Sequence, residues 1–83
     1  MGTARKRPAR LGEKLRSVRE KFEYSLSEMA HAVSDDGVSI LKHDVYRYEN
    51  NQTDPSLIIL LRYSKLARVK MEIFADDSKD LPW

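Results

Sequence analysis

The fold is decided by residues 25–50, which read SLSEMAHAVSDDGVSILKHDVYRYEN. Ser25 and Glu28 have the spacing of a capping box, in which the serine hydroxyl accepts from the amide three residues later and the glutamate reaches back to the serine amide. A helix should therefore begin after Ser25. Its buried face would be formed by Met29, Ala30 and Val33.

A break and an apolar turn should follow this helix. The run Ser34-Asp35-Asp36-Gly37 is typical of a loop, and Gly37 is free to adopt a positive φ. Residues 38–41 are apolar and partly β-branched, which indicates a turn that tucks Val38 or Ile40 inward.

The next helix is predicted over residues 42–50, with Val45 and Tyr48 facing the core. Asn51 suits the position just after a helix, where a left-handed backbone is common. The opposite face of this helix would be exposed and polar, and it consists of Lys42, His43, Tyr46, Arg47 and Asn50.

Helical patterns flank this stretch on both sides. An earlier helix is predicted from Leu11, Leu15, Val18 and Phe22, which share one face, and the charged residues between them would lie in solvent: Glu13, Lys14, Arg16, Arg19 and Glu20. A later helix should have Pro55 in its first turn. Its buried face would consist of Leu57, Leu60, Leu61, Ser64 and Ala67, and its solvent-exposed face would include Arg62 and Lys65. A short last helix is expected over about residues 70–75.

Composition limits the class of protein. The 83 residues suffice for one domain, and the lack of cysteine excludes disulfides, thiolate catalysis and most structural zinc sites. Two histidines and three glycines form neither a catalytic cluster nor a phosphate-binding loop, so we expect no enzyme activity, no metal and no cofactor. The longest apolar run is too short to span a bilayer, and we expect a cytoplasmic protein without a membrane partner.

Charge is distributed unevenly along the chain. Residues 1–22 contain eight lysines and arginines against two glutamates, whereas residues 76–83 contain three aspartates and one lysine. We therefore expect three parts: a basic arm over residues 1–9, disordered without a partner, an all-α domain of five short helices over residues 10–75, and an acidic tail over residues 76–83. A basic surface of this kind is typical of a protein that binds a polyanion, although charge alone is equally compatible with a solvated face.

Residues 11–74 resemble the phage-repressor and Cro-type family of regulators, also called the XRE family. The likeness is carried by Leu11, Leu15 and Arg19 in the first helix, by Ser25 with Met29-Ala30 in the second, and by the run Val45-Tyr46-Arg47-Tyr48-Glu49 followed by Pro55. Three departures stand out. Leu26 replaces a frequent glutamine, Asn51 replaces a frequent glycine, and the connection between Ala30 and Glu49 is about five residues longer than the common form.

The resemblance implies a lambda-repressor-like helix-turn-helix domain that binds double-stranded DNA, with residues 42–50 as the helix that enters the major groove. The positions that would meet base edges are Lys42, His43, Asp44, Tyr46 and Arg47. The positions that would meet the DNA backbone are Ser25, Ser27, Asn50, Asn51, Gln52 and Thr53. Arg5, Lys6, Arg7 and Arg10 would follow the backbone or enter a minor groove.

The sequence also allows a purely structural interpretation of these residues. In that case the polar face of the helix is only solvated, Ser25 only caps, His31 is an ordinary surface residue and the arm is a tail without a partner. Glu49 should tie the end of its helix to Arg19, the arginine that matches the family's position in the first helix.

The function implied is a sequence-specific transcriptional regulator, by family habit a repressor, acting as a homodimer on a two-fold site. Candidate dimer residues are Val69, Met71, Ile73 and Trp83, whereas Phe74 should complete the core. The alternative is an antitoxin or anti-regulator whose main partner is another protein, contacted through the acidic and apolar C-terminal end.

Overall fold

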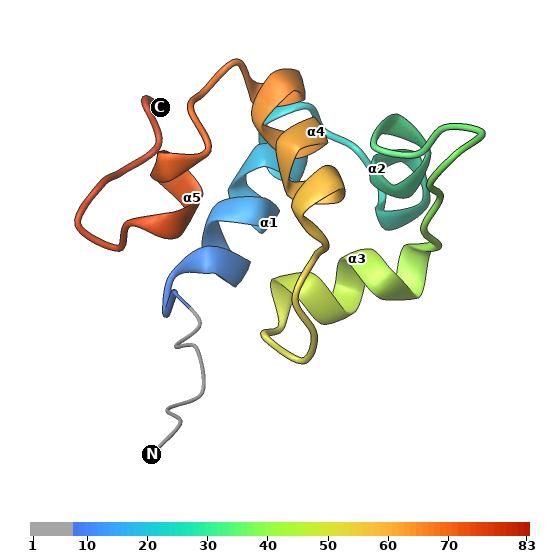
Figure 1. The fold of residues 1–83 in the computed structure, drawn as a ribbon, viewed down its shortest axis with the longest axis horizontal. Helices are drawn as coiled ribbons and strands as arrows, with labels where there is room; N and C mark the ends of the chain where they lie inside the picture. The colour runs from blue at the N-terminus through green and yellow to red at the C-terminus, as the bar shows by residue number, and fades with distance from the viewer. Residues whose placement is uncertain (1–7) are drawn as a thin grey trace.

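Five helices and no strand make up residues 8–83, the part of the chain that the computed structural model describes (Figure 1). In chain order they are α1 (Leu11–Lys21), α2 (Leu26–Ala32), α3 (Lys42–Glu49), α4 (Leu57–Ala67) and α5 (Glu72–Ala75). The predicted all-α class with five short helices is confirmed. Each helix of residues 8–83 is too short or too polar to cross a bilayer.

Helix α1 is the centre of the packing, because it contacts α3, α4 and α5. Leu15 and Val18 on its inner face are completely buried, as the periodicity predicted. Gly12 lies where α1 meets the end of α3: a Cβ atom built there would be 2.6 Å from the carbonyl oxygen of Glu49. The absence of a side chain at Gly12 therefore lets the two helices approach closely.

Helix α2 begins as the capping box predicts. The Ser25 hydroxyl accepts from the Glu28 amide at 3.1 Å, and the Glu28 carboxylate accepts from the Ser25 amide at 2.8 Å. Met29, Ala30 and Val33 are buried on the inner face of this helix, which packs on α3.

The connection between α2 and α3 is ordered by side chains rather than by a left-handed glycine. The prediction of a positive φ at Gly37 is wrong, because no glycine among the described residues has one. Instead, the Asp35 carboxylate accepts from the amides of Gly37 and Val38, at 2.8 and 2.9 Å. Val38 and Ile40 are both half-buried against the core, so the apolar turn is tucked inward as expected.

Arg62 of α4 binds this connection. Its predicted place on the solvent-exposed face of the helix is therefore wrong. Its Nη1 donates to the carbonyl oxygens of Val33 and Val38, at 3.1 and 3.0 Å, and its Nη2 pairs with Asp35 at 2.6 Å. The side chain is 24% exposed. One guanidinium therefore fastens residues 33–38, the first part of the connection, to α4.

Helix α4 begins later and faces differently from the prediction. Ser56 is its N-cap and accepts from the Ile59 amide at 3.2 Å, so Pro55 precedes the helix instead of occupying its first turn. The buried side chains are Ile59, Tyr63, Ser64 and Ala67, with Leu60 half-buried. Leu57 and Leu61, predicted to be buried, are exposed together with Ile58, because the adjacent face, led by Ile59 and Tyr63, packs on the core.

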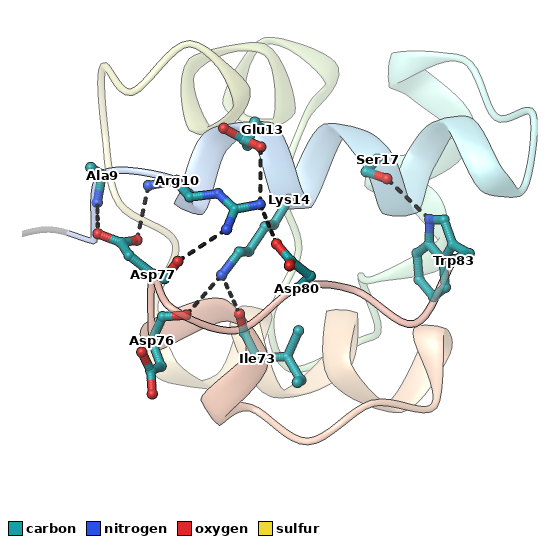
Figure 2. A network of polar contacts seen from close by, with 10 residues as sticks. All are labelled: Ala9, Arg10, Glu13, Lys14, Ser17, Ile73, Asp76, Asp77, Asp80 and Trp83. Atoms are coloured by element: carbon teal, nitrogen blue, oxygen red, sulfur yellow. Dashed lines mark hydrogen bonds and ion pairs between the residues drawn. The ribbon is translucent and has the colours of Figure 1, made fainter.

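Helix α5 is shorter than predicted and begins at Glu72, with Phe74 completely buried as expected. Lys14 of α1, predicted to be in solvent, is only 2% exposed. Its ammonium donates to the carbonyl oxygens of Ile73 and Asp76, at 2.7 and 2.9 Å (Figure 2). The lysine thus satisfies orphan carbonyl groups at the C-terminal end of α5.

Residues 76–83 do not project away from the domain as a tail but return along α1 (Figures 1 and 2). Asp77 accepts from the amides of Ala9 and Arg10, at 2.9 and 3.0 Å. Trp83 donates from its indole nitrogen to the Ser17 hydroxyl at 3.0 Å. These contacts fasten the far end of the chain to the residues that precede α1 and to the middle of that helix.

Candidate nucleic-acid interface

The outward face of α3 is the polar surface that the sequence singles out. Lys42, His43, Tyr46 and Arg47 are all exposed, with Tyr46 at 50%. Arg47 is exposed, and its guanidinium makes no hydrogen bond or ion pair with the side chains or backbone of residues 8–83. Because these cationic and aromatic side chains are already exposed, they can contact an external anion or a nucleic-acid base without any change in the core.

Two buried side chains fix α3 beneath this face. Val45 is completely buried and Tyr48 is 7% exposed, as predicted. Burial raises the pKa of Tyr48, so its phenol stays neutral. A helix held on its inner side by these contacts presents its outer side chains in a defined orientation.

The C-terminal end of α3 is locked by an ion pair to α1. Arg19 donates from Nε and Nη2 to the two carboxylate oxygens of Glu49, at 2.7 and 3.0 Å, and from Nη1 to the carbonyl oxygen of Tyr24 at 3.0 Å. The Glu49 side chain is only 4% exposed. Hydrogen bonding to Glu49 raises the pKa of Arg19 further above its usual range. The predicted Arg19–Glu49 partnership is confirmed, with bidentate geometry.

The N-terminal end of α3 is held by Asp44. Leu41 is the N-cap and provides no side-chain acceptor, but the Asp44 carboxylate accepts from the Leu41 amide at 2.8 Å. Asp44, predicted to meet a base edge, is therefore half-buried and engaged in capping. Its negative charge also lies in the first turn, where it favours the helix.

An open groove runs between α2 and the start of α3. Among its lining residues are Ser27 and His31 from α2, Ser39 from the connection, and Lys42 and His43 from α3. The groove therefore joins residues predicted to meet backbone with residues predicted to meet bases. His31, interpreted from the sequence as a plain surface residue, also lines it, and the signal for this is its position four residues after Ser27 on one helix face.

The loop after α3 contributes exposed polar residues at the other end of the helix: Asn50, Asn51, Gln52 and Thr53. The Asn50 amide group donates to the carbonyl oxygen of Tyr46 at 2.8 Å. Asn51 has a φ of 59°, which confirms the left-handed position predicted for it. Ser25, at the start of α2, is also exposed, and its hydroxyl serves the capping box.

The basic arm is described only at its root. Arg5, Lys6 and Arg7 lie outside the described residues. Arg10, predicted to act with them on DNA, is instead bound to the acidic segment (Figure 2): its guanidinium pairs with Asp80 at 2.8 Å and donates to the carbonyl oxygen of Asp77 at 3.0 Å.

Hydrogen bonds from the amides of Arg10 and Ala9 lower the pKa of Asp77. Asp77 therefore stays ionised, next to the start of α1.

The predicted dimer residues do not form one exposed patch. Val69, Met71 and Ile73 are half-buried, and Val69 packs against the core. Trp83 is 43% exposed, but its ring also lies 4.6 Å from the Lys21 ammonium, a cation–π distance. The larger exposed apolar surface is on α4, where Leu57, Ile58 and Leu61 are 73%, 49% and 38% exposed.

No match was found when the chain was compared with protein-family models, curated proteins and solved structures. In the part of the chain that the structure describes, no three His, Asp or Glu side chains are grouped as metal ligands would be.

Proposed function

We propose that this chain is a sequence-specific, double-stranded DNA-binding regulator of transcription, acting as a repressor, that inserts α3 into the major groove. The observation that carries the proposal is the exposed polar face of α3 on a helix anchored at both ends. Arg19 fixes its C-terminal end through Glu49, and Asp44 fixes its first turn. The resemblance to phage-repressor and Cro-type regulators supports the same role for this helix.

Base recognition is assigned to the side chains that α3 leaves free of the core. An α-helix fits the major groove, where guanine presents two acceptors to an arginine or lysine. Arg47 and Lys42 are suited to that contact, and His43 can donate or accept at a base edge. The ring and hydroxyl of Tyr46 extend the same surface. Asp44 is left out of this set because its carboxylate already caps the helix.

Backbone contacts are assigned to the two flanks of α3. On one flank the groove offers the Ser27 hydroxyl and the His31 imidazole beside Lys42. On the other flank, Gln52 and Thr53 are exposed in the loop after α3. Such contacts would position the protein without reading sequence, and each neutralised phosphate would steepen the salt dependence of binding.

The test is selection of duplexes from a random pool, followed by fluorescence anisotropy on the selected duplex with wild type and Arg47→Ala. Loss of a bidentate arginine–guanine contact should weaken binding about 10- to 100-fold and relax the preference at one base pair. Arg16→Ala is the matched control, because Arg16 is an exposed arginine of α1 paired only with Glu20.

Three results would contradict the proposal. Selection could recover no preferred sequence, Arg47→Ala could bind the selected duplex as wild type does, or Arg16→Ala could weaken binding as much as Arg47→Ala.

A further inference from the structure

Residues 76–83, the acidic segment, lie along one side of α1 (Figure 2). That side is formed by Arg10, Lys14, Ser17 and Lys21, whose spacing of four, three and four residues places them on one face of the helix and its N-cap. Three of these four residues are cations. The acidic segment therefore covers a basic face of α1.

Arg10 is the cation that the acidic segment engages most directly. Its guanidinium pairs with Asp80 at 2.8 Å and donates from Nη1 to the carbonyl oxygen of Asp77 at 3.0 Å. Glu13 makes a longer contact with the same guanidinium, at 3.5 Å. The Asp77 carboxylate accepts from the amides of Ala9 and Arg10. Aspartate and carbonyl oxygens of the segment thus occupy the donors with which Arg10 could bind an external anion.

The charges of the acidic segment are sorted in space. Asp77 and Asp80 face the start of α1, whereas Lys79, the single lysine of the segment, pairs with Glu72 of α5 at 3.5 Å. The segment therefore directs carboxylates toward α1 and its own cation away from it. A line of anionic oxygens against a basic face is also what the phosphate backbone of a duplex offers.

We propose that the acidic segment is an intramolecular competitor of DNA phosphate. Closed on α1, it withholds Arg10 from the backbone of a duplex, and a phosphate that binds Arg10 must displace Asp80. The identity of the polyanion rests on the proposed function. The contact lowers affinity for duplex DNA of any sequence, because backbone contacts do not read bases.

The contact between Arg10 and Asp80 is suited to exchange. The two side chains are 35% and 75% exposed, so water screens the pair and keeps it weak. A phosphate group can bind the same guanidinium through two oxygens, which is a strong geometry for arginine. Other contacts hold the segment in place on both sides of Asp80: Asp77 binds backbone amides, and Trp83 donates to Ser17. Asp80 therefore stays close to Arg10 and competes again when the phosphate leaves.

The test is fluorescence anisotropy of a labelled duplex of arbitrary sequence, titrated with the full chain over a range of salt concentrations. Asp80→Asn frees Arg10 for one more phosphate, so the plot of log K against log salt should steepen by about 0.9, with binding about 5- to 10-fold tighter at about 0.1 M salt. Glu23→Gln is the matched control, because Glu23 is exposed beyond the other end of α1 and its loss removes the same charge. It should change the affinity by less than about 2-fold, since salt screens distant charges. Circular dichroism should show that both variants stay helical.

A double variant tests whether the gain passes through Arg10. Asp80→Asn combined with Arg10→Gln should return the affinity and the salt slope to those of wild type, because the freed cation is gone. An Asp80→Asn variant that binds as Glu23→Gln does, or a gain that survives Arg10→Gln, would overturn the inference.

Selection of duplexes separates this inference from the proposed function. If Asp80→Asn gains affinity through Arg10 but selection recovers no preferred sequence, the proposed function fails and the inference stands. If selection succeeds and Asp80→Asn behaves as the control, only the inference fails. A lack of duplex binding by wild type and every variant at about 50 mM salt would contradict both.

Discussion

Replacing Arg19 with alanine should destabilise the fold more than replacing any other partly exposed charged residue of α1. The guanidinium makes two hydrogen bonds to Glu49 and a third to the carbonyl oxygen of Tyr24. Without it, the Glu49 carboxylate stays in a position where its side chain is 4% exposed, and it has lost its cation.

The magnitude follows from that burial. Removing one partner of a buried ion pair typically costs about 3–5 kcal/mol, and we expect about 3 kcal/mol here because Arg19 itself is 18% exposed. For a domain of this size, 1 kcal/mol shifts the melting temperature by about 4–8 °C, so the expected drop is about 12–24 °C. A domain of 83 residues has a total stability of about 4–12 kcal/mol, so the variant would be close to unfolding.

Thermal and urea unfolding followed by circular dichroism measures the effect, with Arg16→Ala as control. Arg16 pairs with Glu20 on the same helix at 3.3 Å, but both side chains are about 60% exposed, so its loss should cost below about 0.5 kcal/mol. The double variant Arg19→Met, Glu49→Leu should recover much of the loss, because no charge is left buried. Equal melting temperatures for Arg19→Ala and Arg16→Ala would refute the reasoning.

Three further predictions concern packing, a buried hydroxyl and acid. Gly12→Ala should lower the free energy of unfolding by about 1–3 kcal/mol in urea, since its Cβ would sit 2.6 Å from the Glu49 carbonyl oxygen; a gain would mean that α1 and α3 can separate at no cost. Tyr63→Phe should leave stability unchanged or raise it by about 1 kcal/mol, because the Tyr63 hydroxyl is buried without a hydrogen-bond partner; a loss above 1 kcal/mol in the same assay would disprove this. The pKa of Asp77 is lowered from 3.8, so its contribution is present above that value and lost as pH falls through the lowered one; the fluorescence of Trp83, the single tryptophan, should shift on acidification below pH 4, and already at neutral pH in Asp77→Asn.

The elements around α3 could be predicted because their signals are local. The capping box at Ser25 and the alternation of apolar and polar residues along α3 each depend on neighbours within one or two turns. The Arg19–Glu49 pair is the exception, since its partners are 30 residues apart, and only the family resemblance suggested it. The exposed face of α3 follows from the same local pattern.

The buried face of α4 could not be predicted, because residues 57–61 are apolar on every side of the helix. Periodicity chooses a buried face only where polar residues mark the opposite one. In the structure the buried face is the one that contains Tyr63. The sequence does not reveal this, because a tyrosine is equally common at the boundary between core and solvent.

The remaining differences come from contacts between distant residues and backbone carbonyl groups. Lys14 is buried because the end of α5 offers it two carbonyl oxygens, and nothing in the sequence around Lys14 reveals them. Arg10 resembles a continuation of the basic arm in sequence, but Asp77 and Asp80 bind it from the other end of the chain. Ionic residues in an amphipathic helix therefore show where the helix is, but not which of them lie in solvent.

The guanidinium of Arg62 makes the geometry of residues 25–50 depend on α4. Arg62 of α4 bridges Val33, Asp35 and Val38. The angle between α2 and α3 therefore depends partly on a helix that comes later in the chain. Residues 25–50 transplanted alone into another scaffold would keep the exposed side chains of α3 but would lose the contacts with Arg62 that help to set the tilt of this helix. If α3 binds DNA as proposed, a new target preference can arise at its exposed side chains alone, whereas a change at Arg62 would alter the tilt of the whole helix.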